Sequence, residues 1–152
     1  MGRRRAGFTL VEVLVVMIIL GLLSGIALLK YLDMRATAKT AALAADFRAV
    51  TVAALNYYAD NNEWPAESGP GQVPNGLRGY LPGGLTETLE RPDYVLDYEN
   101  IALGETPLIG VSVRATDTRL MGKFVATFGD RSPFFMNGDK LTYLIAGPGG
   151  VF

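Results

Sequence analysis

The architecture of this 152-residue chain follows from Gly7-Phe8-Thr9-Leu10-Val11-Glu12, which places one carboxylate at the start of a long apolar run. After Glu12, no charged side chain occurs until Lys30. Residues 8–29 would form about 33 Å of helix at ~1.5 Å per residue, which is enough to span the hydrocarbon core of a bilayer. A lone acid in such a segment costs roughly 2.5–3.5 kcal/mol, so we expect Glu12 to have a functional partner.

The charges that flank the apolar run predict its orientation. Arg3, Arg4 and Arg5 stand just ahead of it, and basic residues beside a membrane span favour the cytoplasmic side. We therefore expect a cytoplasmic N-terminus, with everything after Lys30 outside the inner membrane. An ordinary secretory signal peptide is a weaker interpretation, because its apolar region is shorter and would not hold an acid near its beginning.

The helix is expected to continue beyond the apolar run. Residues 30–60 contain neither glycine nor proline, and apolar side chains recur there at the spacing of one helical face: Leu43, Phe47, Val50 and Ala54. We predict one helix from about Thr9 to about Asp60, whose second half packs on a domain, with Lys39, Asp46 and Arg48 largely on other faces. Within the apolar half, Gly21 and Gly25 form a G-x-x-x-G pair. Such pairs allow close helix approach in membranes, although glycine is also simply common there.

The remainder of the chain predicts a small antiparallel sheet. Residues 65–84 hold four prolines and six glycines and should form a long loop. The β-prone segments follow at residues 94–98, 108–114 and 141–146. Between the last two, a short helix is expected, capped by Thr116 or Asp117 at its start and by Gly129 at its end. The fold class is thus α+β, with a long N-terminal helix packed on a small antiparallel β-sheet head.

Three acids gather around the first β-prone segment. Asp93, Asp97 and Glu99 occupy odd positions, which face one side of a strand. Oxygen-rich clusters suit Ca²⁺, so these residues are calcium candidates, but we favour a solvated acidic face.

The composition argues against other chemistry. With no histidine and no cysteine, the chain lacks the usual general base and any thiolate ligand, so we expect no enzymatic activity and no other cofactor. A net charge of −1 gives no bulk attraction to nucleic acid.

The leader arginines, the Gly7–Glu12 stretch and the apolar run together resemble the class III signal of type IV pilins and type II secretion pseudopilins. The resemblance implies that prepilin peptidase cuts after Gly7, that Phe8 becomes the methylated N-terminus, and that Glu12 neutralises the terminal amine of a neighbouring subunit. It also implies an organisation into four parts: a cytoplasmic leader (1–7), a transmembrane and filament-core helix (8–29), its amphipathic continuation (30–62) and a pilin-like head (63–152).

Three functions remain open on this sequence. We favour a structural subunit of a type II secretion pseudopilus, which would polymerise with itself and with related pilin-like subunits on an inner-membrane assembly platform. The absence of cysteine favours it, because many pilins close a C-terminal loop with a disulfide, and the helix exit at residues 57–65 also resembles that of pseudopilins. The alternatives are a surface type IV pilin for adhesion, motility or DNA uptake, and a single-span anchored binding domain that does not polymerise. The expected location is the bacterial inner membrane with a periplasmic head, and then an extracytoplasmic filament.

Overall fold

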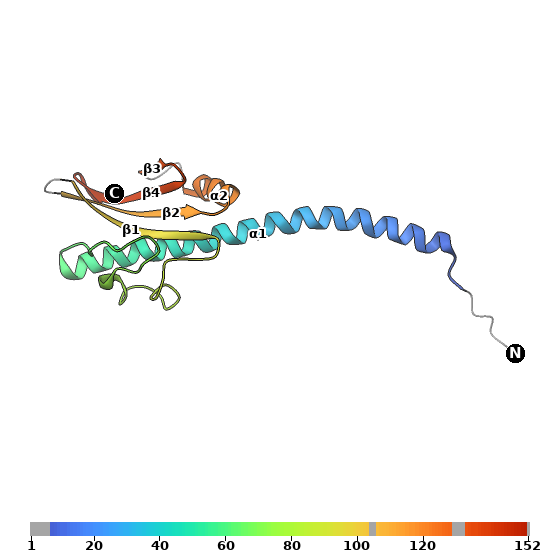
Figure 1. Ribbon diagram of the computed structural model, residues 1–152, viewed down its shortest axis with the longest axis horizontal. Helices are drawn as coiled ribbons and strands as arrows, with labels where there is room; N and C mark the ends of the chain where they lie inside the picture. The colour runs from blue at the N-terminus through green and yellow to red at the C-terminus, as the bar shows by residue number, and fades with distance from the viewer. Residues whose placement is uncertain (1–6, 104–105, 129–132, 152) are drawn as a thin grey trace. The chain divides into compact units, whose positions relative to one another are not determined.

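The computed structural model describes residues 7–103, 106–128 and 133–151 (Figure 1). The chain divides into two compact units, residues 1–36 and residues 37–152. The predicted long helix is confirmed as α1 (Leu10–Asn61), within one residue of the expected end points. The leader arginines lie outside the described residues.

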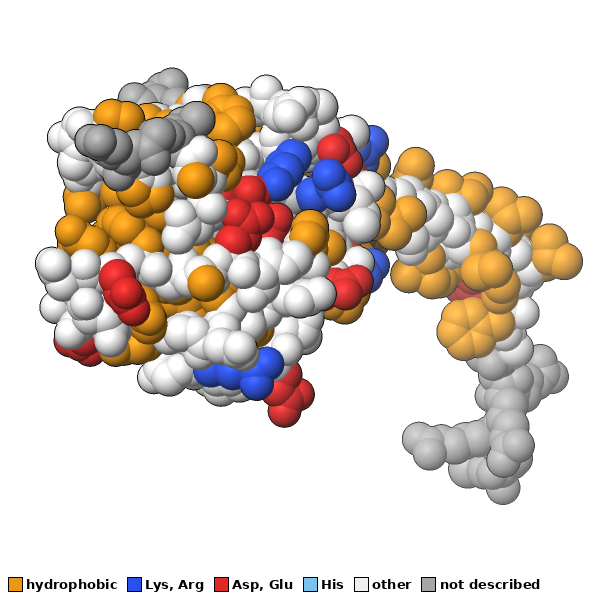
Figure 2. All heavy atoms as spheres, turned by 60° about the vertical axis from the view of Figure 1, so that its left-hand side comes forward, with side chains coloured by type: hydrophobic (Ala, Val, Ile, Leu, Met, Phe, Trp, Pro, Cys, Tyr) orange, Lys and Arg blue, Asp and Glu red, His pale blue; other side chains and the backbone are white. Residues whose placement is uncertain are grey.

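In the N-terminal unit, α1 exposes its apolar surface completely. Every side chain from Phe8 to Leu29 is exposed, and Figure 2 shows hydrophobic side chains covering this part of the helix. Among the described helices, α1 alone is long and apolar enough to cross a membrane. An apolar surface of this extent requires lipid or another protein to cover it.

In the second unit, α1 carries the apolar stripe that the sequence predicted. Its buried residues share one face and are Thr40, Leu43, Phe47, Val50, Ala53 and Ala54. Phe47 packs edge-on against Phe124 and Tyr143, with ring centroids 5.5 and 5.6 Å away. The helix stops at Asn62, whose φ of 54° is left-handed and whose N–H donates to the Tyr58 carbonyl at 2.8 Å.

Five antiparallel strands form the sheet: β1 (Tyr94–Leu103), β2 (Thr106–Ala115), β3 (Phe134–Asn137), β4 (Lys140–Gly147) and β5 (Gly150–Val151). The order is β1-β2-β4-β3, with β5 also paired to β4. The three predicted strands are confirmed as β1, β2 and β4, each longer than expected, whereas β3 and β5 were not predicted. The core face alternates along the strands, so that Leu96, Tyr98, Val111 and Val113 are buried on it.

The short helix α2 (Thr118–Phe128) lies between β2 and β4 in the chain, as predicted. Asp117 caps it, because its Oδ1 accepts the Arg119 N–H at 2.8 Å. The buried side of α2 consists of Leu120, Met121 and Phe124. The expected C-cap, Gly129, lies outside the described residues.

The proline- and glycine-rich segment is an ordered loop, as expected, with one 3₁₀ turn, η1 (Asn75–Leu77). It lines the outer edge of β1, where Leu96 donates its N–H to the Leu89 carbonyl and accepts the N–H of Gly71, both at 3.1 Å. The loop therefore closes that sheet edge with backbone hydrogen bonds.

Two charged residues of α1 form contacts with the head that the sequence did not predict. Asp46 accepts hydrogen bonds from Arg91 Nε at 3.0 Å and from Tyr94 Oη at 2.9 Å. Lys39 pairs with Asp93. Neither residue belongs to the buried stripe, in agreement with the predicted helical faces; both lie beside it, and their side chains reach partners that are distant in sequence.

Two glycines of the head have opposite surroundings. A Cβ built on Gly110 would lie 2.8 Å from the Tyr143 carbonyl oxygen, whereas one on Gly122, inside α2, meets nothing within 4 Å. We expect Gly110→Ala to lower the free energy of unfolding by about 1–3 kcal/mol, because a backbone atom must move. Gly122→Ala should raise it by about 0.5–1 kcal/mol, because alanine restricts the unfolded chain. Denaturant titrations of the two purified variants measure both changes, and shifts of the same sign would contradict the comparison.

Candidate functional sites

The predicted cleavage position lies in a non-helical segment ahead of α1. Gly7, Phe8 and Thr9 have no helical structure, and all three are exposed. The peptide bond between Gly7 and Phe8 is therefore accessible in the structure.

Glu12 caps its own helix. Thr9 is the N-cap residue of α1, and its N–H and hydroxyl both donate to Glu12 Oε2 at 2.8 Å. In return, the Glu12 N–H donates to Thr9 Oγ1 at 3.2 Å. This reciprocal arrangement is a capping box, in which a threonine and a glutamate three residues later satisfy each other's amide groups. The T-x-x-E pattern could have revealed it, yet sequence reasoning assigned Glu12 a partner in a neighbouring subunit alone.

Gly21 and Gly25 are exposed on α1, one helical turn apart. A Cβ built on either glycine meets nothing within 4 Å, so no contact among the described residues of the chain itself requires glycine there. Both positions are open to another helix, and their role in assembly remains a prediction.

The acidic residues of β1 form an ion cluster with Lys140 of β4. The Lys140 ammonium pairs with Glu99 Oε1 and lies 3.5 Å from Asp97 Oδ2. Ser112 of β2 donates to Glu99 Oε1 at 2.6 Å, and its Oγ also shares a hydrogen bond with Thr142 Oγ1 at 2.8 Å. These five side chains span three neighbouring strands on the sheet face opposite the core.

The expectation of a solvated acidic face was wrong for two of the three acids. Asp97 and Glu99 are only 6% and 7% exposed. Asp93 lies apart from them, since it precedes β1 and pairs with Lys39. The three calcium candidates therefore do not gather at one point, and no group of three His, Cys, Asp or Glu placed to hold a metal occurs among the described residues.

Burial and charge oppose each other within the ion cluster. Burial, assisted by the negative charge of Glu99, raises the pKa of Asp97 to about 6. Burial also acts to raise the pKa of Glu99, but hydrogen bonds from Lys140 and Ser112 outweigh it and lower that pKa overall. Asp97 Oδ1 is buried and has no hydrogen-bond partner among the described residues. Within this cluster, ionisation is therefore less favourable for Asp97 than for Glu99.

Asp97→Asn should stabilise the protein at neutral pH. Because the folded pKa of Asp97, about 6, exceeds the unfolded value of about 3.9, the folded chain binds more protons between these values, and this residue's contribution to stability falls as pH rises through that window. Asparagine does not ionise, so the variant does not lose stability in this pH window. Its side-chain amide can still accept a hydrogen bond from Lys140 and donate one to Glu99. We expect its Tm to exceed the wild-type Tm by several degrees at pH 7.5, with the difference shrinking toward pH 4.5. Thermal melts across this range measure it, and a difference independent of pH would contradict the assignment.

Two family models match the chain. Residues 2–28 match the prokaryotic N-terminal methylation motif, and residues 36–90 match the model described as PilW, C-terminal. No curated relative matches the chain. The first match covers the predicted cleavage position, the capping box and most of the exposed apolar helix, and the second covers the packed half of α1 and the loop that borders β1.

Proposed function

Because this chain is a type IV pilin-like protein, we propose that it is a structural filament subunit whose segment 8–29 forms the filament core. The observation that carries the proposal is an apolar helix segment whose side chains are all exposed, with a single acid in its first turn. A helix of this kind keeps an apolar environment throughout assembly if it exchanges lipid for the helices of neighbouring subunits.

The precursor would sit in the inner membrane with its N-terminus in the cytoplasm and its head outside. Prepilin peptidase would cleave after Gly7, and Phe8 would become the N-methylated terminus. The exposed, non-helical residues 7–9 support this step. Gly21 and Gly25 would then allow close approach of a neighbouring helix, because both present bare backbone.

Glu12 would exchange partners during assembly. In the single subunit, its carboxylate accepts two hydrogen bonds from Thr9. In the filament, the same carboxylate would pair with the terminal amine of a neighbouring Phe8. Such a pair lowers the cost of burying both charges, and it selects one axial register between subunits.

Within this family, we propose the type II secretion pseudopilus as the filament. The cysteine-free sequence and the aromatic helix exit support this assignment, with Tyr58 and Trp64 stacked where α1 ends. The partners would be further copies of this chain, related pilin-like subunits and the inner-membrane assembly platform.

The first test is the intact mass and N-terminal sequence of the protein purified from its native membrane. A chain that begins at N-methylated Phe8, and that keeps residues 1–7 when prepilin peptidase is deleted, supports the filament subunit. An uncleaved chain in the wild-type strain would overturn the proposal and favour a plain anchored domain.

Deleting this chain's own gene distinguishes a pseudopilus from a surface pilus. A loss of secreted proteins with intact surface pili supports the pseudopilus, and the reverse result contradicts it.

A further inference from the structure

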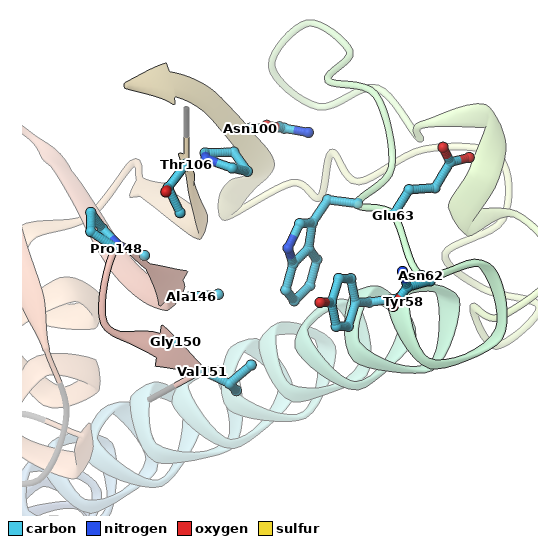
Figure 3. Close-up of a pocket in the computed structure, with 12 residues that line it drawn as sticks. Tyr58, Asn62, Glu63, Asn100, Thr106, Ala146, Pro148, Gly150 and Val151 are labelled. Atoms are coloured by element: carbon cyan, nitrogen blue, oxygen red, sulfur yellow. The ribbon is translucent and has the colours of Figure 1, made fainter. Parts of the chain in front are cut away.

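An open cavity of about 630 Å³ lies within the head, where α1 ends (Figure 3). Small-molecule sites typically have volumes of about 300–1,000 Å³. The walls come from the end of α1, the middle of β1, the start of β2 and the β4–β5 hairpin. The lining residues on which the argument rests are Tyr58, Asn62, Glu63, Trp64, Asn100 and Thr106.

One wall is aromatic. The Tyr58 and Trp64 rings are stacked, with centroids 4.3 Å apart and planes inclined by 17°. Tyr58 covers one face of the indole, yet Trp64 is only half-buried and lines the cavity, so its remaining surface is available there. The face of an indole is electron-rich and attracts weakly positive C–H groups laid flat against it.

The rest of the lining offers hydrogen-bonding groups. Figure 3 shows Thr106 and Pro148 on the side of the cavity away from Tyr58, Asn62 and Glu63. Neither the Asn62 side-chain amide nor the Thr106 hydroxyl donates to a described residue, whereas the Asn100 side-chain amide donates to the Pro65 carbonyl at 2.8 Å. The cavity thus presents uncommitted polar groups beside a flat apolar surface.

The charge of the lining narrows the class of ligand. None of the lining residues is Lys or Arg, and one of them is an acid, Glu63, whose Oε1 accepts a hydrogen bond from Tyr57 Oη at 3.4 Å. A phosphate or carboxylate ligand would therefore meet a negative group without a compensating cation. A neutral ligand with one apolar face and several hydroxyls fits both walls.

We propose that this cavity binds a neutral saccharide, with one pyranose ring stacked on Trp64 and its hydroxyls bonded to Asn62 and Thr106. The inference goes beyond the structural role proposed above and applies to the unassembled subunit. Loss of sugar binding and loss of filament assembly are consequently separate results.

The chain contains one tryptophan, so tryptophan emission, excited selectively over that of the seven tyrosines, reports on this cavity. The experiment titrates the full-length protein, in a detergent without a sugar headgroup, with cellotriose, maltotriose and triacetylchitotriose. We expect at least one of them to shift the emission saturably, with half-saturation at about 1 mM or below, corresponding to about −4 kcal/mol. Failure of all three at ten times that concentration would overturn the proposal. An emission shift that follows protein concentration instead would assign the cavity to a second copy of the chain and would also overturn it.

Variants test the polar contacts. Thr106→Val and Asn62→Gly each remove one hydrogen-bonding group, and glycine tolerates the positive φ of position 62. We expect each variant to raise the half-saturation concentration at least fivefold while the Tm stays within a few degrees of wild type. Asn56→Ala, on an exposed part of α1 outside the cavity, is the matched control and should bind as wild type. Unchanged binding by both cavity variants would contradict the proposed site.

Discussion

Replacing Glu12 by glutamine should abolish filament assembly while the subunit still inserts into the membrane. Glutamine can take the place of glutamate in a capping box, so Glu12→Gln keeps the hydrogen bonds from Thr9 and removes only the charge. The neighbour's terminal amine then has no carboxylate to pair with in the apolar filament core. We expect the filament fraction, sheared from cells and measured against the membrane fraction, to fall at least tenfold, since each ~1.4 kcal/mol lost from a contact is a factor of ten.

The matched control for this prediction is Thr9→Val. It keeps the Glu12 carboxylate but removes the hydroxyl that gives and receives two of the three capping hydrogen bonds. The cap should weaken by about 1 kcal/mol, which faster amide hydrogen exchange in residues 10–13 would report, while filaments still form. The reverse pattern, with filaments lost in Thr9→Val and retained in Glu12→Gln, would mean that Glu12 serves the helix cap and not the neighbouring subunit.

Replacing Lys140 by methionine should strongly destabilise the head at neutral pH. Lys140 is the cation that faces Asp97 and Glu99, and methionine would leave two buried carboxylates facing each other. Removing one partner of a buried ion pair costs about 3–5 kcal/mol. Because the Lys140 side chain is 28% exposed, water screens part of this effect, and we expect a loss of about 2–3 kcal/mol in the free energy of unfolding.

Acidification should partly rescue this variant. The destabilisation should shrink between pH 7.5 and pH 5, because protonation of Asp97 leaves a single buried charge. Denaturant titrations at the two pH values measure the change.

Arg114→Met is the control for Lys140→Met, since Arg114 lies opposite Lys140 in the β2–β4 register and pairs with the exposed Asp139. We expect Arg114→Met to lower the free energy of unfolding by no more than about 1 kcal/mol at either pH. Equal losses in the two variants would show that the buried cluster contributes no more than a surface ion pair.

The sequence predicted the features of this fold that depend on local periodicity. The helix stripe around Phe47, the cap of α2 at Asp117 and the three central strands all follow from spacing and turn chemistry within a few residues. The capping box at the helix start could have been predicted equally well, because Thr9 and Glu12 are only three residues apart.

Features that depend on contacts between distant residues were not predictable in this way. Asp97 and Glu99 are acidic residues of a strand, so the sequence favours a solvent-exposed position for both. Their partner Lys140 lies more than 40 residues later in the chain and reaches them across an intervening strand. The edge strand β3 has four exposed residues, including Phe134 and Phe135, and therefore lacks the alternation that predicts a strand. Trp64 could be expected to pack, but its place in a cavity depends on the hairpin near the C-terminus.

The position of the capping box has a consequence for proteolytic maturation. All the hydrogen bonds that fix the start of α1 lie within residues 9–13, downstream of the bond between Gly7 and Phe8. Cutting that bond breaks none of them, so the first turn of the helix is complete in the precursor and remains complete in the product. A peptidase that cuts this bond, as proposed, would therefore have no helix to unwind at residues 7–9, which precede the apolar helix without helical structure of their own.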